Sequence, residues 1–462
     1  MTEFDYVIVG AGPAGCVLAN RLSADPGVNV LLAEAGDADT NPLIAMPRGF
    51  GELLGDPASV WHYPTRPFGP TQRVEYWVRG KTLGGSSSVN GLVYNRGNGA
   101  DYDALERLGN PGWGWDDMLP VFKKIEDNEL GPSEVRGAGG PLHVSTVEET
   151  DPLLEDVITA GTELGWRRMR DLNATDEERI GYAMATIRDG QRVSAANAFL
   201  HPVMDRPNLT VALCTVLDQV VLAGGRAVGV RGRQNRQTFE AQATREVLLA
   251  TGSLATPKLL QLSGIGPAAA LRPVGVEVEV DSPKVGARLR ERLAFMLQFR
   301  PAEDLGYNKL LSTEAGQLAA AEQYQRARRG PLAVPRSISS GSSRPARSST
   351  APMPSSRSRR SRCCRWNPAR RSRWSRSRAC CASPTSCGPT ARAASSSPRR
   401  IPTRRWTSTP TTSPPSTTAP RPWASCGACA GCSPPGRSPS GSSARRCPGR
   451  PSRQTRRSSM PG

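Results

Sequence analysis

The sequence predicts an α/β fold for residues 1–333 and no fold for residues 334–462. Three observations lead to this prediction. An apolar run near the N-terminus enters a G-x-G-x-x-G turn, strand-like runs recur as far as residue 250, and Asp, Glu and Leu all stop before residue 334. The charge divides at the same place, since the first 333 residues hold 34 of the 60 Lys and Arg and all 41 acids, a net of −7, against +19 for the whole chain. The basic net charge therefore says nothing about the partners of the first 333 residues.

The N-terminal elements are expected in the order strand, turn, helix, strand. Residues 4–9 form a short apolar run typical of a buried parallel strand, and they lead into Gly10-Ala11-Gly12-Pro13-Ala14-Gly15. A helical pattern follows over residues 16–22, and residues 29–33 form the next strand. A glycine-rich turn between a strand and a helix is the arrangement of a Rossmann-like dinucleotide-binding domain.

Each residue type in this unit has a chemical role. Gly10 permits the tight turn, Gly12 lets the backbone approach a pyrophosphate, and Gly15 lets the helix pack closely on the strand. The helix N-terminus faces the phosphates, and Glu34, at the end of the second strand, can accept a hydrogen bond from a ribose hydroxyl. We therefore expect these four residues to bind the cofactor.

Later strands favour a flavin over a nicotinamide. Residues 246–252 form a strand that enters a small-residue turn, a pattern that recurs in flavoproteins where the chain crosses back beside the dinucleotide. Residues 209–213, 216–222 and 227–230 have the pattern of short strands with a Gly224-Gly225 turn, as in a β-meander.

Two long motifs resemble those of the glucose–methanol–choline (GMC) flavoprotein oxidoreductases, close to the choline and alcohol dehydrogenases. The first motif is Gly80-Lys81-Thr82-Leu83-Gly84-Gly85-Ser86-Ser87-Ser88-Val89-Asn90-Gly91. The second is Gly252-Ser253-Leu254-Ala255-Thr256-Pro257-Lys258-Leu259-Leu260-Gln261-Leu262-Ser263-Gly264-Ile265-Gly266-Pro267. The resemblance covers about residues 4–332.

The resemblance implies an FAD-binding Rossmann-like domain interleaved with an incomplete substrate domain. The FAD-binding segments are expected at about 4–145 and 205–290, and the substrate-domain segments at about 146–204 and 291–333. The tail, 334–462, lies outside both domains.

The resemblance also implies which residues meet FAD. Gly84, Gly85 and Ser86 offer consecutive backbone N–H groups with little side-chain bulk, which suits a phosphate or a flavin ring. By resemblance, Leu83 and the stretch Asn90, Gly91, Leu92 and Val93 lie along the flavin, and Val216 meets the adenine end. Some relatives bind the flavin covalently through a histidine in the first motif, whereas residues 78–82 contain none. Non-covalent FAD is therefore expected.

The activity implied by the resemblance is FAD-dependent oxidation of a small-molecule alcohol to an aldehyde or ketone. The base in this family is a histidine near the C-terminus, but the only histidines here are His62, His143 and His201. The catalytic residues therefore stay unassigned, and we expect impaired turnover. Two alternatives stay open: an FAD-binding protein without turnover whose basic tail binds nucleic acid or anionic surfaces, and a non-redox protein of the hydroxynitrile lyase type.

Residues 334–462 hold 26 Arg, 31 Ser and 20 Pro, with no Leu, Phe or Tyr, so they cannot bury a core and are expected to be disordered. They allow three interpretations. The tail is a basic interaction arm, or a metal site formed by Cys426, Cys429 and Cys432, or the product of out-of-frame translation of a GC-rich gene. We favour the third, because the composition changes inside the expected substrate domain, and we expect no metal.

The compartment is expected to be the cytoplasm. The N-terminus is acidic and lacks the basic flank of a secretory signal, and no apolar run reaches the roughly 18 residues that span a bilayer. Only Cys16 and Cys214 precede the tail, which gives no disulfide framework. The sequence leaves the oligomeric state open.

Overall fold

A computed structural model describes residues 2–146, 150–287, 289, 297–303, 305–335, 339–342 and 380–382. All of them belong to the first of two units into which the chain divides, 1–406 and 407–462. Within the tail expected to be disordered, the structure describes only residues 334–335 and two short strands, Ser339–Ser342 and Cys380–Ala382. The rest of the tail, with its cysteine motif, lies outside the described residues.

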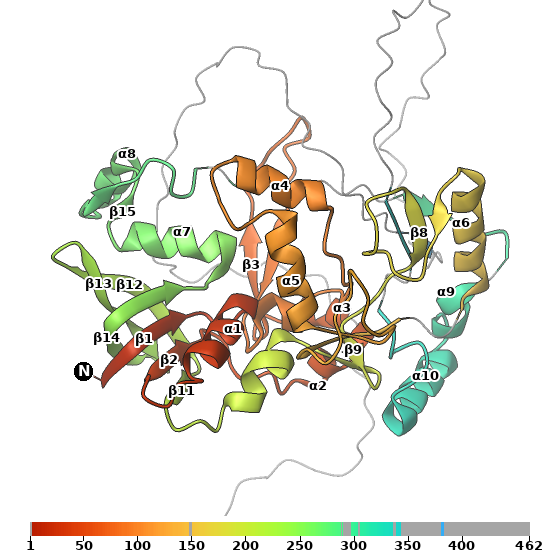
Figure 1. Ribbon diagram of the computed structural model, residues 1–462, viewed down its shortest axis with the longest axis horizontal. Coiled ribbons are helices and arrows are strands. Elements are labelled where there is room, and N and C mark those ends of the chain that lie inside the picture. Colours follow the sequence, from red (N-terminus) through yellow and green to blue (C-terminus); the bar gives the residue numbers. More distant parts are fainter. Residues whose placement is uncertain are drawn as a thin grey trace, which may run out of the picture. The chain divides into compact units, whose positions relative to one another are not determined.

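The largest sheet of the described residues is a mixed sheet of six strands, at the lower left in Figure 1, and together with its helices it confirms the expected α/β class. Its order is β11-β2-β1-β14-β13-β12, with β11, β2, β1 and β14 parallel and β14, β13 and β12 antiparallel. The strands are β1 (Thr2–Val9), β2 (Val30–Ala33), β11 (Leu209–Ala212), β12 (Thr215–Ala223), β13 (Arg226–Gln234) and β14 (Gln237–Leu249).

Alternation along β1 gives the sheet two apolar faces. Ile8 packs on one face with residues of α1 (Pro13–Leu22), among them Cys16. Val7 and Val9 point to the other face, where Leu259 of α7 (Gly252–Leu262) packs. Because β1 and β2 are covered on both sides, they carry the continuous apolar runs typical of a parallel sheet.

The remaining elements lie outside this sheet. The other α-helices are α2 (Pro42–Ala45), α3 (Phe50–Leu53), α4 (Gly99–Arg107), α5 (Trp115–Ile125), α6 (Pro152–Glu163), α8 (Ala268–Leu271), α9 (Gly306–Leu311) and α10 (Glu314–Ala327). Short helical turns are η1 (Pro47–Gly49), η2 (Gly85–Ser88), η3 (Ala196–Leu200), η4 (His201–Val203) and η5 (Arg272–Val274). The other strands are β3 (Val60–Pro64), β4 (Tyr76–Gly80), β5 (Glu126–Asn128), β6 (Leu142–Val144), β7 (Arg167–Arg168), β8 (Arg179–Tyr182), β9 (Ile187–Arg188), β10 (Gln191–Arg192), β15 (Ile265–Gly266), β16 (Val280–Asp281), β17 (Leu297–Phe299), β18 (Ser339–Ser342) and β19 (Cys380–Ala382).

One expected strand has a different partner from the one predicted. Residues 209–213 were assigned to the meander, but β11 lies at the parallel edge of the sheet, where Leu209 pairs with Val30. The chain turns away after it at Cys214, whose φ of 50° is left-handed. The meander instead consists of β12, β13 and β14, with the Gly224-Gly225 turn between its first two strands.

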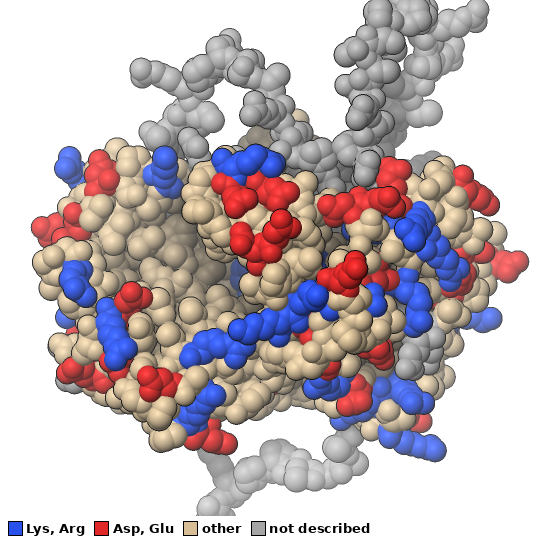
Figure 2. Space-filling model, viewed as in Figure 1, with Lys and Arg blue, Asp and Glu red and all other residues tan. Residues whose placement is uncertain are grey.

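The six-stranded sheet draws its strands from the two segments expected to bind FAD, about 4–145 and 205–290. β1 begins at Thr2, two residues before the first of these segments. The domain boundaries themselves stay a prediction. Among the helices of the described residues, none is both long and apolar enough to cross a membrane. Acidic and basic side chains are interspersed on the face drawn in Figure 2.

The packing of α1 on β1 predicts a stability loss for Gly15→Ala. A Cβ at Gly15 would lie 1.9 Å from the carbonyl oxygen of Gly10, so the helix must shift, which we expect to lower the free energy of unfolding by about 3 kcal/mol or more. Urea unfolding followed by far-UV circular dichroism measures this loss. The control is Gly51→Ala in α3, where no atom lies within 4 Å of the added methyl group. Equal stability of the two variants would contradict the packing argument.

Candidate functional site

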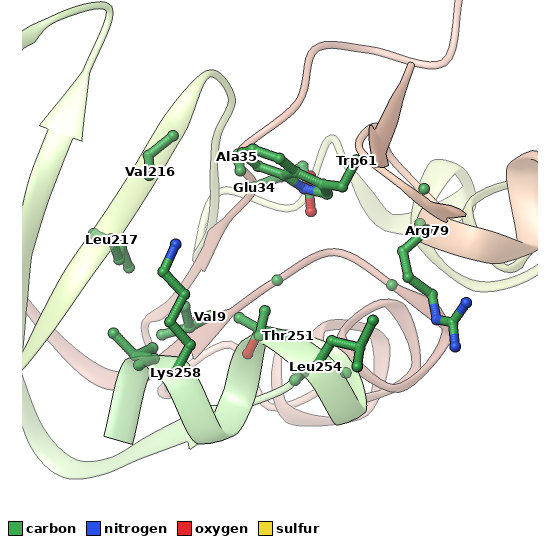
Figure 3. Close-up of a pocket in the computed structure, with 18 of the residues that line it drawn as sticks. Val9, Glu34, Ala35, Trp61, Arg79, Val216, Leu217, Thr251, Leu254 and Lys258 are labelled. Atoms are coloured by element: carbon green, nitrogen blue, oxygen red, sulfur yellow. The ribbon is translucent and has the colours of Figure 1, made fainter. Parts of the chain in front are cut away.

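A cavity of about 450 Å³ lies where β1 and β2 end and where α1 and α7 begin (Figure 3). Its wall combines segments that lie far apart in the sequence. The lining residues are Val9, Gly10, Gly12, Pro13, Ala33, Glu34, Ala35, Trp61, Tyr63, Arg79, Gly80, Gly85, Ser86, Thr215, Val216, Leu217, Asp218, Ala250, Thr251, Gly252, Ser253, Leu254, Ala255, Lys258, Leu259 and Leu262.

Backbone meets backbone at the base of this cavity. Gly10 has a φ of +98°, and a Cβ there would lie 2.8 Å from the carbonyl oxygen of Ala250. A Cβ at Gly85 would lie 2.7 Å from the Cα of Gly12. The N–H of Gly84 also donates to the carbonyl of Ala11 at 2.8 Å. Glycine is required at these crossings because no larger residue leaves room for the second chain segment.

Two helix N-termini contribute to the cavity wall. α1 begins after Gly12 and α7 after Thr251, and neither residue caps its helix with a side-chain hydrogen bond. The first N–H groups of a helix have no partner within the helix, and the helix dipole adds positive potential there. Gly12 and Pro13 of one helix start and Gly252 and Ser253 of the other line the cavity, so both helix starts favour an anionic ligand.

Glu34 lies beside the first of these helix starts and is 6% exposed. One carboxylate oxygen accepts from the N–H of Ala11 at 2.8 Å and the other from the N–H of Gly36 at 2.8 Å. Burial raises the pKa of Glu34, because desolvation outweighs these two hydrogen bonds. Each oxygen keeps a second lone pair for a further donor.

The structure brings part of the expected cofactor set together. Six expected residues line the cavity: Gly10, Gly12, Glu34, Gly85, Ser86 and Val216. The other seven do not: Gly15, Leu83, Gly84, Asn90, Gly91, Leu92 and Val93.

Four of those seven residues have structural roles that their contacts define. Gly15 lies within α1, and Leu83 is buried in the core that includes α1. Leu92 is buried with Ala185 and Ile187, in a left-handed conformation with a φ of 65°. Asn90 bends the chain, because its side-chain oxygen accepts from the N–H of Leu92 at 3.0 Å.

Several lining residues were not predicted from the sequence. Trp61 of β3 lies near Glu34 and Ala35, and Lys258 extends from α7 on the side where Val216 and Leu217 lie (Figure 3). Arg79 of β4 lines the opposite end. Lys258 stands within the second motif and Arg79 directly before the first, so proximity to a motif was the available signal.

The three histidines have partners outside this cavity. His62 Nε2 lies 2.8 Å from the carbonyl of Leu54, and His143 Nδ1 lies 3.0 Å from the carboxylate of Asp127. His201 Nε2 lies 3.0 Å from a carboxylate oxygen of Asp39, and this hydrogen bond raises its pKa. None of the three lines the cavity.

Cys16, in the first turns of α1, is unsuited to nucleophilic chemistry. Its side chain is fully buried, its thiol donates to the carbonyl of Ala11 at 3.2 Å, and burial raises its pKa to about 12. Within the described residues, no group of three or more His, Cys, Asp and Glu could hold a metal ion.

Relatives of known function match the N-terminal part of the chain. The chain is 43% identical over 298 residues to alcohol dehydrogenase [acceptor] of Pseudomonas putida, covering 64% of this chain and 54% of the relative. It is 42% identical over 304 residues to mitochondrial choline dehydrogenase of Homo sapiens, covering 64% and 51%. The chain thus spans about half the length of these curated relatives.

Solved structures give the same result. Pyridoxine 4-oxidase from Mesorbium loti is 38% identical with a TM-score of 0.59, covering 61% of this chain and 55% of that one. A formate oxidase from Aspergillus oryzae RIB40, in a variant studied for FAD modification, is 30% identical with a TM-score of 0.68, covering 73% and 61%. Residues 4–294 match the family described as GMC oxidoreductase, and the chain belongs to that family.

Proposed function

We propose that this chain binds FAD in the cavity between α1 and α7, and that its reaction type is oxidation of an alcohol to an aldehyde or ketone. The observation that carries the proposal is the glycine-lined cavity with two uncapped helix N-termini. Its chemistry fits a dinucleotide, which needs close backbone approach and positive potential at its pyrophosphate. The relatives named as alcohol and choline dehydrogenases, and the formate oxidase described with FAD, support the same assignment.

Different residues would contact different parts of the cofactor. The N–H groups at the start of α1, next to Gly12, would hold the pyrophosphate, and Glu34 would accept from a ribose hydroxyl. Val216 of β12 would meet the adenine, and the stretch 83–93 would lie along the flavin. The chemistry that FAD supplies in such a reaction is acceptance of a hydride from the alcohol carbon.

The hydroxyl proton needs a base in this reaction, and no described residue is a good candidate. His62, His143 and His201 are bonded elsewhere, and the sequence contains no histidine after residue 201. We therefore propose a chain that binds FAD and turns over slowly. Its substrate would be a small alcohol.

The cavity predicts weaker FAD binding for Gly12→Ala. A Cβ at Gly12 has its nearest neighbour at 3.8 Å, the carbonyl oxygen of Ala250, so the fold tolerates the methyl group while the pyrophosphate loses close backbone approach. We expect the Kd for FAD to rise at least tenfold, about 1.4 kcal/mol. Titration of the apoprotein with FAD, followed by flavin fluorescence, measures it. Gly51→Ala, which lies away from the cavity, serves as the control and should bind as the unmodified chain does.

The absence of a histidine and of a cysteine from residues 78–93, the stretch proposed to lie along the flavin, supports non-covalent FAD. We expect acid precipitation of the FAD-loaded protein to leave all of the flavin in the supernatant. Absorbance of the supernatant and the pellet measures the partition. Flavin retained in a washed pellet would contradict the prediction.

The missing base predicts slow turnover. General base catalysis contributes about 10²–10⁴-fold, so we expect the rate to fall by that factor from an ordinary value of about 10 s⁻¹. Steady-state assays of the FAD-loaded chain with choline and simple alcohols, using an artificial electron acceptor, measure it. A rate near 10 s⁻¹ would show that another group removes the proton.

A further inference from the structure

Arg192 is a buried cation that contacts the first motif from a distant part of the chain. It lies in β10 and is 4% exposed. Its Nη1 donates to the carbonyl of Ser87 at 3.0 Å and to Asn90 Oδ1 at 2.7 Å, and its Nη2 donates to the carbonyl of Asn90 at 2.9 Å. Its Nε donates to the carbonyl of Ile44 at 2.9 Å. The guanidinium thus joins the motif to α2.

No carboxylate pairs with Arg192 in the described part of the chain. Buried Arg96, by comparison, is paired with buried Glu126. Burial lowers the pKa of Arg192 to about 10, so the group is still cationic at neutral pH. An isolated buried charge is costly unless its hydrogen bonds are made, which here are all to carbonyl-type oxygens. This arrangement fixes one conformation of the oxygens it contacts.

The oxygens of Ser87 and Asn90 belong to the part of the first motif that directly follows the residues of the cavity wall. Gly85 and Ser86 line the cavity, and Ser87 follows directly in η2. A second contact comes from the segment that carries Arg192, since the N–H of Ala195 donates to Ser87 Oγ at 2.9 Å. Ser87 Oγ in turn donates to the carbonyl of Gly84 at 2.6 Å. Arg192 and Ala195 therefore hold Ser87 of η2 through both its carbonyl and its hydroxyl group.

Arg192 also sets the direction of a backbone donor. The peptide bond between Asn90 and Gly91 is trans, because the described chain has no cis peptide bond, so the N–H of Gly91 points away from Arg192. A Cβ built at Gly91 meets no atom within 4 Å.

We propose that Arg192 is a positioning residue for the flavin: by fixing the carbonyl groups of Ser87 and Asn90, it holds the stretch 84–93 in the shape that receives the ring. The inference rests on the proposed function, because it requires that the chain bind FAD. Arg192 acts through the backbone of the motif and does not line the cavity. A guanidinium is required because its planar fork, with five N–H donors, reaches four oxygens, whereas a lysine ammonium has three donors on a single nitrogen.

The test compares FAD titrations of the full-length apoprotein and its variants Arg192→Met and Arg192→Lys. We expect Arg192→Met to raise the Kd for FAD at least tenfold and to shift the visible spectrum of the bound flavin toward that of free FAD. Arg192→Lys, which keeps the charge without the fork, should fall between Arg192→Met and the unmodified chain. It also provides the measurement if the methionine variant does not fold.

Arg179→Met is the matched control. Arg179 is also 4% exposed and donates to main-chain carbonyls, those of Leu172 and Glu177, and it does not line the cavity. We expect its substitution to lower the thermal unfolding temperature and to leave the Kd and the flavin spectrum unchanged.

Three results are decisive against the inference. A folded Arg192→Met or Arg192→Lys variant with the Kd and spectrum of the unmodified chain would overturn it. So would an equal loss of FAD affinity in Arg179→Met, since that would indicate general loosening of the fold. Failure of the unmodified chain to bind FAD would overturn the proposed function itself, and the inference with it.

Discussion

The fold depends on the close approach of three backbone segments beside the first helix. A Cβ at Gly10 would clash with the carbonyl of Ala250, and a Cβ at Gly85 would clash with the Cα of Gly12. The strand pairing explains how these segments meet, because β14 lies next to β1 and delivers Ala250 to the end of the sheet where the glycine turn begins. Since backbone contacts backbone at these glycines, the base of the cavity presents peptide groups, which can bind phosphate without a large basic side chain.

Hydrogen bonds join the backbone segments that meet beside the first helix. Ala11 links two of the segments, because its carbonyl accepts from Gly84 while its N–H donates to Glu34. Glu34 is therefore a structural residue as well as a candidate ribose contact, and its second oxygen is bonded to Gly36. Burial raises the pKa of Glu34, because desolvation disfavours its charged form, while its two hydrogen bonds satisfy backbone N–H groups that would otherwise be buried without a partner. Its roles in folding and in binding are compatible, because each oxygen can accept more than one hydrogen bond.

The sequence predicted the parts of the fold and site that depend on local contacts. The strand, turn, helix and second strand were predictable because the glycine spacing and the apolar runs specify them within about 30 residues. β11 was misassigned because four residues of strand pattern fit a meander as well as a parallel edge, and only the pairing with β2 distinguishes them. Arg192 could not be predicted, since its contacts with Ser87 and Asn90 cross 105 and 102 residues. The cavity-lining positions Arg79 and Lys258 could not be recognised from a periodic sequence pattern, because a cavity is formed by single residues on several elements.

In the proposed function, cofactor binding and proton removal are separable for a topological reason. Every residue that lines the cavity lies between Val9 and Leu262, within the part of the chain that matches the family. The crossing that creates the cavity needs only β1, β14, the turn before α1 and the first motif, all of which fold within that range. A base supplied by another part of the chain would act on the alcohol, and its loss would leave these backbone contacts intact. Backbone packing specifies a dinucleotide site, whereas individual side chains specify turnover. A chain can therefore keep the site for the dinucleotide and lack the base that turnover needs.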